Sequence, residues 1–414
     1  MIKQWTNIYI YIEYIKTKYS NYIRNQYKYK LYHQHGIHTI LIVLVLILTT
    51  VTILLFLLLY KLLFGMCSHL NDYTGNGLTD IVIQIHEGDS TVNIAKTLQK
   101  YKVINTIDGF IYASRQKSIF RCIQPGFYRI RTNISDSSAV ERLASPINRV
   151  GRLIIPEGRQ LDDIVDLKNN CKIDGIFSLI AQTSCILLNS KIQCVSVDEL
   201  KKAAQKAPLE SLAIPKWASI QVKTLNGNYK RIEGLISSGM WNINPTVPAQ
   251  NIICYLIANS VNLYTGVGLL KVSAIMQLSP YQILTLASLA QKETKPQDFS
   301  KIIRVIYNRI IQNRKLELDS TVNYLLNNQE IATARKDRFR PTMWNTYVYY
   351  GLPKTPICTP GTDVLNATGR PANGDWLYFV TINLSGITLF TNDYNQHLTN
   401  VKLAQENGVL NSVK

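Results

Sequence analysis

The sequence predicts an α+β protein attached to a membrane by a single N-terminal helix. Three observations support this fold class. An uncharged, apolar run extends over Thr39–Tyr60, strand-like and helix-like segments alternate after residue 80, and the last third of the chain is rich in helical patterns. With 414 residues, the chain is long enough for two or three domains.

The membrane helix is predicted over residues 37–63. A helix rises about 1.5 Å per residue, so Thr39–Tyr60 matches the roughly 30 Å hydrocarbon core of a bilayer. Basic residues are frequent before this run, and none occurs between Lys61 and Lys96. The positive-inside rule therefore places the N-terminus in the cytoplasm and the rest of the chain in the periplasm. The long basic region and long apolar run argue against a cleaved signal peptide, so we expect an uncleaved, single-pass anchor in the inner membrane.

Composition disfavours several function classes. A net charge of +18 and a pI near 9.5 are compatible with nucleic-acid binding. The basic residues are scattered along the sequence, however, so we expect no nucleic-acid partner and favour a basic surface that faces an acidic extracytoplasmic polymer. The six histidines and seven cysteines lack zinc-ligand spacing, so we expect no metal and no other cofactor. An oxidising compartment would permit a disulfide among Cys171, Cys185 and Cys194, although most cysteines are expected to be small buried apolar side chains.

Residues 80–150 are predicted to form a small strand-helix-helix-strand unit. A strand over Ile81–Ile85 is followed by the turn Glu87-Gly88-Asp89-Ser90, which ends in a helix cap. The unit is small for a catalytic core and suits a binding module. Its expected elements are strands at 81–85 and 126–130 and helices at 91–100, 106–116 and 135–143.

The next stretch, residues 151–230, is predicted less completely. A strand over Arg152–Ile155 is followed by a turn and by a helix expected to begin at Gln160. Apolar periodicity is weak from residue 168 onward, where only a helix near Val197–Gln205 is expected. The sequence therefore predicts a connecting region of uncertain fold here.

The helix after Ser279-Pro280 carries the candidate catalytic residue. Serine is a favoured helix cap and proline a favoured first helical residue, and Pro296 bounds the helix on its other side. Glu293 lies at the end of the helix's apolar stripe, which consists of Ile283, Leu286, Ala287 and Ala290. Burial raises the pKa of a carboxyl group, which suits a general acid near neutral pH. The alternative is an acid at a frayed helix end, bonded to a loop.

The residues around Glu293 resemble the catalytic helix of the YceG-like endolytic murein transglycosylases, a family also called MltG. The resembling run is Leu286-Ala287-Ser288-Leu289-Ala290-Gln291-Lys292-Glu293-Thr294. The resemblance covers roughly residues 80–400 and is densest after residue 283. The other matching motifs, in the family's order, are Pro125-Gly126-Phe127-Tyr128, Ile155-Pro156-Glu157-Gly158, Glu233-Gly234, Tyr307-Asn308-Arg309, Asp319-Ser320-Thr321-Val322, Asn345-Thr346-Tyr347, Gly351-Leu352-Pro353, Pro356-Ile357, Pro360-Gly361 and Leu377-Tyr378-Phe379-Val380.

The resemblance implies a small LysM-like module followed by an α+β catalytic domain. It also implies cleavage of the MurNAc–GlcNAc bond in nascent peptidoglycan, which leaves a 1,6-anhydro-MurNAc end. One carboxyl group, here Glu293, suffices for this chemistry, because it first protonates the glycosidic oxygen and then takes the proton of the sugar's C6 hydroxyl. The expected partners are peptidoglycan glycan strands and the membrane, with peptidoglycan synthases as a further candidate. The predicted domains are a cytoplasmic tail (1–36), the transmembrane helix (37–63), a linker (64–79), the LysM-like module (80–150), the connecting region (151–230) and the catalytic domain (231–405).

Five further residues are predicted to bind the substrate. Asp319 either caps a turn or contributes to the site. Asn345 and Tyr347, with the neighbouring Trp344, offer amide and aromatic surfaces of the kind that bind glycans. Asn308 lies on a predicted basic helix over residues 302–314, where sugar hydrogen bonding is one role and a structural pair between Arg309 and an acid is the alternative.

Departures from the family pattern leave three hypotheses. Gln291 stands where the family often has Glu, and Ser320 stands where it has Pro. The preferred hypothesis is a membrane-bound lytic transglycosylase. The second is a catalytically weak glycan-binding or division-complex scaffold, and the third is a hydrolase with Glu293 and Asp319 as a carboxylate pair. Turnover separates the second from the others, and product analysis separates the first from the third.

Overall fold

The computed structural model has a mixed α+β fold, as predicted, with helices and small sheets of two or three strands. The chain divides into two compact units, Met1–Asp72 and Tyr73–Lys414, which are considered separately below. The residues that the structure describes are 2–69, 72–117, 122–166, 171–326, 328–329 and 335–409.

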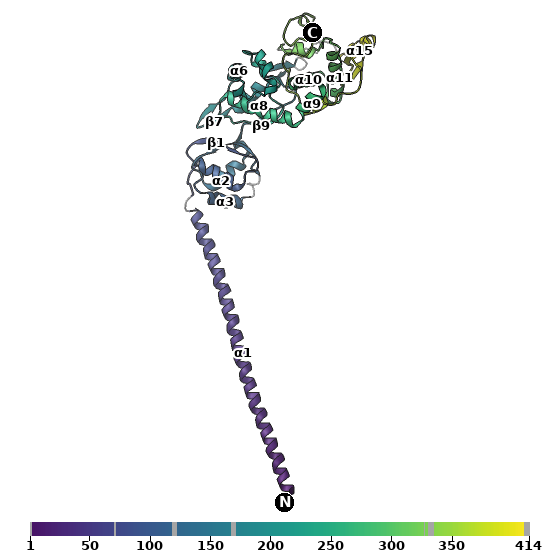
Figure 1. The fold of residues 1–414 in the computed structure, drawn as a ribbon. Helices are drawn as coiled ribbons and strands as arrows, with labels where there is room; N and C mark the ends of the chain where they lie inside the picture. The colour runs from purple at the N-terminus through teal and green to yellow at the C-terminus, as the bar shows by residue number, and fades with distance from the viewer. Residues whose placement is uncertain are drawn as a thin grey trace. The chain divides into compact units, whose positions relative to one another are not determined.

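The first unit contains the continuous helix α1 (Ile2–His69), seen in Figure 1. Within it, Leu41–Tyr60 has a mean hydropathy of 3.2 and none of its window is buried inside the protein. This segment is therefore long and apolar enough to cross a membrane. The helix extends beyond residues 37–63 on both sides, so the expected tail and the first residues of the expected linker are also helical.

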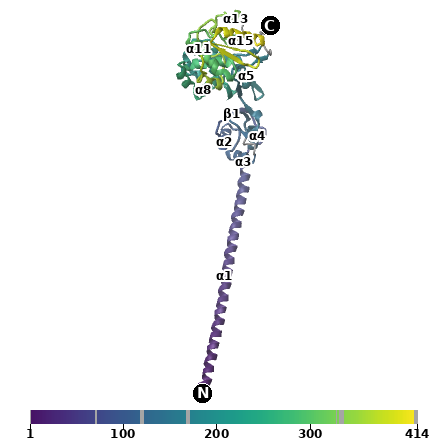
Figure 2. The same ribbon diagram turned by 90° about the vertical axis from the view of Figure 1, so that its right-hand side faces the viewer.

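The N-terminal part of the second unit contains the predicted strand-helix-helix-strand arrangement. Three strands form a sheet of order β1-β2-β3, and β1 runs antiparallel to β2 with Ile83 opposite Tyr128. Helices α2, α3 and α4 lie beside this sheet (Figure 2) and bury Leu98, Phe110 and Leu143 in a common core. The elements are β1 (Asp80–Ile85), α2 (Thr91–Lys100), α3 (Ile107–Gln116), β2 (Gly126–Arg131), α4 (Asp136–Ala144), the 3-10 helix η2 (Pro146–Asn148) and β3 (Arg149–Val150).

Local capping explains why these helices begin where the sequence predicts. The side chains of Ser90, Thr106 and Ser135 each accept a hydrogen bond from a backbone N–H in the first turn of α2, α3 and α4, respectively. Such caps satisfy donors that would otherwise lack a partner at a helix N-terminus.

The prediction of a helix that begins at Gln160 is wrong. Residues 160–163 are irregular and lead into β5 (Ile164–Asp166), which pairs antiparallel with β6 (Cys171–Ile173), and α5 begins only at Ile176. β-Branched residues in β5 favour a strand. The backbone N–H of Ile176 donates to the Gln160 carbonyl at 2.8 Å, so Gln160 is fixed by a contact that is distant in sequence.

The expected connecting region is folded and shares a core with the C-terminal part. Leu161, Phe177 and Leu200 from this region belong to the same buried cluster as Leu286 and Ile303. Its remaining elements are β4 (Arg152–Ile155), α5 (Ile176–Ser184), β7 (Ile186–Leu188), β8 (Lys191–Gln193), α6 (Val197–Lys206), η3 (Glu210–Leu212), η4 (Lys216–Ala218), α7 (Ser219–Thr224) and η5 (Tyr229–Ile232). The helix predicted near Val197–Gln205 is thus confirmed.

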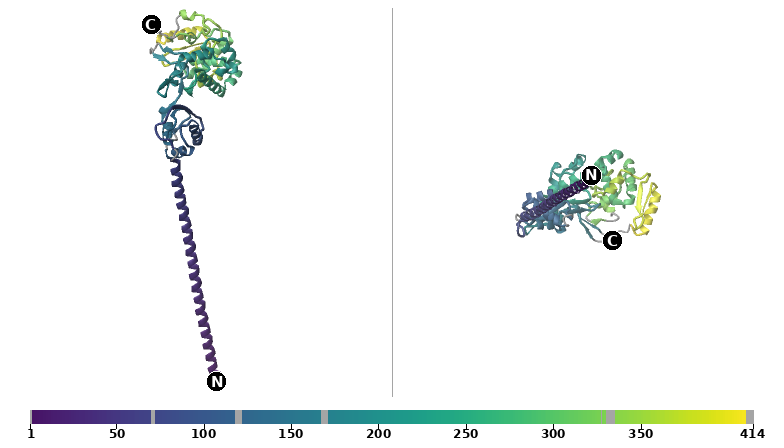
Figure 3. Two further views of the ribbon diagram at one scale, coloured as in Figure 1. Left: turned by 90° about the vertical axis from the view of Figure 1, so that its left-hand side faces the viewer. Right: turned by 90° about the horizontal axis from the view of Figure 1, so that it is seen from below.

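The C-terminal part is built around α10, which packs against α9, α11 and α14 (Figure 1). A hairpin of β11 and β12 packs with α15 at the end of the chain, shown in yellow in Figure 3. The elements are β9 (Gly239–Asn242), α8 (Ala249–Gly266), α9 (Leu269–Met276), α10 (Pro280–Glu293), η6 (Pro296–Asp298), α11 (Phe299–Ile311), α12 (Asp319–Asn323), β10 (Asn328–Gln329), α13 (Arg335–Arg338), α14 (Thr362–Thr368), β11 (Tyr378–Thr381), β12 (Thr388–Thr391) and α15 (Tyr394–Glu406).

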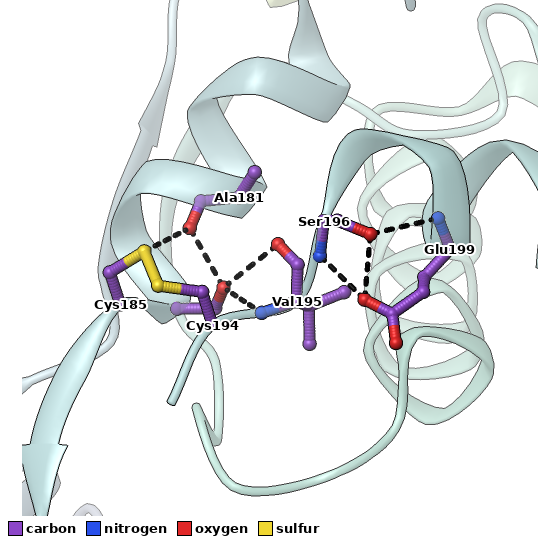
Figure 4. Close-up of a disulfide and its surroundings, with 7 residues drawn as sticks. Ala181, Cys185, Cys194, Val195, Ser196 and Glu199 are labelled. Carbon is purple, nitrogen blue, oxygen red and sulfur yellow. Dashed lines mark hydrogen bonds between the residues drawn. A yellow bond between two sulfur atoms is a disulfide. The ribbon is translucent and has the colours of Figure 1, made fainter. Parts of the chain in front are cut away.

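A disulfide joins Cys185 and Cys194 at the base of the β7–β8 hairpin (Figure 4). Pairing of Ile186 with Gln193 brings the two cysteines together at the junction of α5 and α6. Beside the bridge, the Ser184 hydroxyl accepts a hydrogen bond from the backbone N–H of Val195 at 3.0 Å. The bridge fits an oxidising compartment, where structural disulfides persist.

We expect replacement of both bridge cysteines, Cys185→Ser with Cys194→Ser, to lower the free energy of unfolding by roughly 2–3 kcal/mol, because the open loop gains entropy in the unfolded chain. Urea unfolding of the oxidised wild type and the double variant measures this difference. Cys122→Ser, which removes an exposed free thiol, is the matched control and should leave stability unchanged. Equal stability of wild type and double variant would contradict the bridge.

Candidate active site

Helix α10 positions Glu293 at its last residue. The helix starts with a capping box, in which the Ser279 hydroxyl accepts from the Gln282 N–H at 3.3 Å and the Gln282 side chain accepts from the Ser279 N–H at 2.8 Å. Pro280 occupies the first turn, as predicted. From Tyr281 to Ala290 every residue except Gln282 is buried, so the core surrounds the helix on all sides. Its C-terminal turn emerges from the core with the carboxyl group of Glu293.

The carboxyl group of Glu293 lies in a largely dry environment. Glu293 as a whole is half-buried. Its Oε1 atom is fully buried and has no hydrogen-bond partner among the described residues. Burial, with a smaller contribution from the nearby charge of Asp319, raises the pKa of Glu293 to about 7 against the opposing effects of Ser320 and Arg309. A glutamic acid in this environment retains its proton near neutral pH and can donate it.

Asp319 lies beside Glu293 at the first residue of α12. Its Oδ1 accepts a hydrogen bond from the Tyr347 hydroxyl at 2.8 Å, and its Oδ2 forms an ion pair with Arg338 Nη2 at 3.2 Å. Burial and the neighbouring Asp319 charge raise the pKa of the Tyr347 hydroxyl far above its ordinary value, so the phenol stays protonated as a donor. The structure therefore brings Glu293, Asp319 and Tyr347 together from three separate segments.

Asn345 organises the loop that carries Tyr347. Its side chain is 1 % exposed, and its Nδ2 donates to the carbonyls of Arg338 and Arg340 at 3.0 and 2.8 Å. Its Oδ1 accepts from the Tyr347 N–H at 2.9 Å. These contacts saturate the amide, so its role in the structure is to position Tyr347.

The hydrogen bonds of Trp344 and Asn308 are made with residues other than Glu293. The Trp344 ring is 4 % exposed, packs on Tyr324 and donates from its indole N–H to the Thr355 hydroxyl at 2.7 Å. Asn308 donates to the carbonyls of Gly374 and Trp376 at 3.2 and 3.0 Å. Direct substrate contact by either residue stays a prediction.

Arg309 provides a buried positive charge near Glu293. The expected partner of this arginine was an acid, but the guanidinium instead donates to the backbone carbonyls of Leu377, at 2.7 Å, and Leu316. Arg309 therefore makes no direct ion pair within the described part of the chain. Its positive charge favours the ionised form of Glu293. Helix α11, which carries Arg309, ends at Ile311 and not at Arg314 as predicted.

Sequence patterns missed three contributors to this region. Ser320 lies next to Glu293 with its hydroxyl buried, and it favours the ionised form of Glu293. Tyr349 and Tyr350 follow Tyr347 and are 53 % and 62 % exposed, so they offer the aromatic surface that had been expected from Trp344. The Tyr347–Tyr350 sequence itself was the available signal, because clustered exposed tyrosines in a loop suggest binding.

A second glutamate, Glu233, has a similar pKa but a different environment. Burial raises its pKa to about 7, and its Oε2 accepts hydrogen bonds from the Tyr324 hydroxyl at 2.8 Å and the Leu161 N–H at 3.2 Å. The residue is 0 % exposed. Glu293 is partly accessible and Glu233 is not, so only Glu293 can meet a substrate. No group of three or more His, Cys, Asp or Glu side chains suited to a metal occurs within the described ranges.

Comparison with known proteins assigns the chain to a family. The chain belongs to the YceG-like family, whose model matches residues 83–403. Two similar proteins are named endolytic murein transglycosylase: that of Bacillus subtilis is 26 % identical over 77 % of this chain and 83 % of its own length, and that of Streptococcus pneumoniae R6 is 25 % identical over 78 % and 58 %. The chain thus spans little more than half of the pneumococcal relative. A crystal structure of a YceG-like protein from Listeria monocytogenes covers 77 % of this chain and 98 % of that one, with 23 % identity and a TM-score of 0.46.

Proposed function

We propose that the protein is a membrane-anchored endolytic lytic transglycosylase that cleaves MurNAc–GlcNAc bonds in nascent peptidoglycan and leaves 1,6-anhydro-MurNAc ends. Family membership and the names of the two relatives support this substrate class. The observation that carries the proposal is Glu293, a half-buried acid with a pKa of about 7 at the end of the core helix α10.

The proposed reaction uses one carboxyl group twice. Protonated Glu293 donates its proton to the glycosidic oxygen as the bond from that oxygen to C1 of MurNAc breaks. The resulting carboxylate removes the proton of the C6 hydroxyl, and O6 forms a bond to C1, which closes the anhydro ring and restores the acid. No water is consumed, so a second carboxylate is not needed to activate one. The negative charge of Asp319, which acts on Glu293, is proposed to favour positive charge developing at C1 as well.

The other predicted residues divide into two proposed roles. Asp319 and Tyr347 border Glu293 and are proposed to contact the sugar, with Tyr349 and Tyr350 as an exposed stacking surface. Asn345 is proposed to act through Tyr347. The two-carboxylate hydrolase is disfavoured because Asp319 already accepts from Tyr347 and pairs with Arg338.

The proposed topology has residues 1–36 in the cytoplasm and the second unit in the periplasm, anchored in the inner membrane by residues 37–63. Residues 80–150 would serve as a LysM-like glycan-binding module, and a peptidoglycan synthase is a further proposed partner. The asymmetry of basic residues around Leu41–Tyr60 supports this orientation.

A fusion experiment tests the topology. A phosphatase that is active only outside the cytoplasm should be active when fused after Lys414 and inactive when fused after Lys30, because the anchor separates the two positions. Immunoblots of both fusions control for expression. The opposite pattern would overturn the orientation and remove peptidoglycan as a possible substrate.

The proposed activity is tested on purified, uncrosslinked glycan strands with the full chain in detergent. We expect release of fragments that end in 1,6-anhydro-MurNAc, detected by chromatography and mass spectrometry. Binding of strands without any cleavage would favour the scaffold, and fragments with reducing ends would favour the hydrolase.

A further inference from the structure

A polar cavity of about 400 Å³ lies next to the C-terminal turn of α10. One wall comes from residues 156–160, Asp162 and Ile164 and from Ile173 and Asp174, and the other comes from Gln291 and Lys292. Its volume falls within the range typical of small-molecule sites, about 300–1,000 Å³. Gln291 and Lys292 immediately precede Glu293, so the cavity and the proposed catalytic carboxyl group share one helical turn.

Hydrogen bonds hold the two walls of the cavity to a common loop. The Gly158 N–H donates to the Thr359 carbonyl at 2.8 Å, and the Thr359 N–H donates to the Arg159 carbonyl at 2.8 Å. Across the cavity, the Gln291 side chain accepts from the Gly361 N–H at 2.9 Å. The 156–160 segment and α10 are thus bound to the same loop, and the cavity is preformed for a ligand.

Gln160 is the unexplained residue in this wall. Its side chain is 3 % exposed, and its Nε2 has no hydrogen-bond partner among the described residues. Buried amide donors are almost always paired in folded proteins. An unpaired donor in the wall of a preformed cavity therefore points to a ligand that supplies a carbonyl oxygen.

Other groups in the wall narrow the ligand chemistry. Ile164 and Ile173 lie opposite each other in the β5–β6 pair and give the cavity an apolar patch. The charged side chains of the wall are the acids Glu157, Asp162 and Asp174 and the bases Arg159 and Lys292. Asp162 pairs with Lys201 and Lys230, and Asp174 pairs with Lys172, whereas Glu157, Arg159 and Lys292 make no ion pair within the described part of the chain. The cavity thus offers an amide donor, a surface for a methyl group and two cations, Arg159 and Lys292, beside one unpaired acid, Glu157.

We propose that this cavity is a substrate subsite that holds an N-acetylated sugar of the glycan strand together with a carboxylate of its attached peptide. The inference rests on the proposed function and adds a site to it. The acetamide carbonyl accepts from Gln160 Nε2, its methyl group lies on Ile164 and Ile173, and Lys292 binds the carboxylate. Because successive helical residues diverge by about 100°, the strand passes around the end of α10 between this subsite and Glu293.

Two variants of the full chain test the subsite by binding. Each is made on the Glu293→Gln background so that strands stay intact, and affinity is measured for short strands with and without stem peptides. Gln160→Met should weaken both ligands roughly five- to tenfold, because one hydrogen bond to the acetamide is lost. Lys292→Gln should weaken only peptide-bearing strands by a similar factor. Gln193→Met and Lys202→Gln, at exposed positions outside the cavity, are the matched controls.

Thermal melting distinguishes a ligand-binding role of the Gln160 side chain from a structural role. A binding role predicts that Gln160→Met keeps or raises the melting temperature, because a buried unpaired amide is replaced by an apolar chain of similar length. A lower melting temperature, or unchanged affinity for both strands in both variants, would overturn the subsite. If the wild type also produces no cleaved ends, the proposed function fails as well; if cleavage is normal, only the subsite fails.

Discussion

Glu293→Gln is expected to abolish formation of anhydro ends, with a loss of roughly 10³-fold or more. General acid–base catalysis contributes about 10²–10⁴-fold, and here one residue supplies both proton transfers. The amide keeps the size of the side chain but can neither donate a proton to the glycosidic oxygen nor take one from the C6 hydroxyl. In the wild type, kcat/KM should fall as pH rises above about 7, because only protonated Glu293 starts the reaction.

Glu233→Gln is the matched control for this substitution. Its carboxyl group also has a pKa of about 7, but it is sealed from solvent, and a glutamine can keep the hydrogen bonds from Tyr324 and Leu161. This variant should retain turnover. A folded Glu293→Gln protein with near-wild-type turnover, or an equally inactive Glu233→Gln protein that remains folded, would refute the assignment.

Stability should respond to Glu293→Gln in the opposite direction to activity. Folding raises the pKa of Glu293 from 4.5 to about 7, so the folded state disfavours the carboxylate, and the wild type loses stability as pH rises between these values. The amide cannot ionise. At about pH 8 the variant should therefore have a free energy of unfolding that is higher by on the order of 1–3 kcal/mol, and the difference should vanish below about pH 4.5.

Asn345→Asp is expected to destabilise the protein by on the order of 3–5 kcal/mol. The substitution places a buried carboxylate oxygen against the carbonyls of Arg338 and Arg340, which now accept from Asn345 Nδ2. The loop should then release Tyr347 from Asp319, and turnover should fall by about 10²-fold even where the protein is folded, because the site loses its geometry. Chemical unfolding and turnover at low temperature measure the two effects.

Asn262→Asp serves as the control for Asn345→Asp, because this residue is exposed on α8. It should change neither stability nor turnover appreciably. An Asn345→Asp protein that unfolds like the wild type would contradict the role of this amide in holding the loop.

The elements that were predicted well are those with local causes. Between residues 80 and 150, strand alternation and the caps Ser90, Thr106 and Ser135 each act within a few residues. Helix α10 was predictable for the same reason, since its cap and apolar positions lie within its own sequence. The position of Glu293 at the end of the buried stripe followed from helical period alone.

Apart from helix α6, the region from residue 160 to 230 could not be predicted, because its contacts are distant in sequence. Buried Arg231 donates to the Ala204 carbonyl at 2.6 Å, and Asp162 is paired with Lys201 and Lys230. These contacts, and not a local apolar periodicity that a sequence would reveal, fix the structure of this region. The buried amide of Gln160, which marks the proposed subsite, has no signature in the sequence at all.

The sequence predicted which residues lie in the candidate site better than it predicted what each of them does there. Asp319 and Tyr347 lie beside Glu293. Nothing in the motif around Asn345, however, indicates that its amide donates to backbone carbonyls. Trp344 looked like a glycan platform because it is aromatic. Packing against Tyr324 and Thr355 buries it instead, and burial depends on segments that the motif does not contain.

The most direct test of the proposed chemistry is cleavage of uncrosslinked glycan strands in water enriched with heavy oxygen, followed by mass spectrometry of the new ends. Because Glu293 is proposed to pass the proton of the C6 hydroxyl and no water enters the product, the account predicts anhydro ends that are lighter by one water than hydrolysis products and carry no heavy oxygen. Reducing ends that carry heavy oxygen would contradict it and would support a hydrolase that uses a second carboxylate.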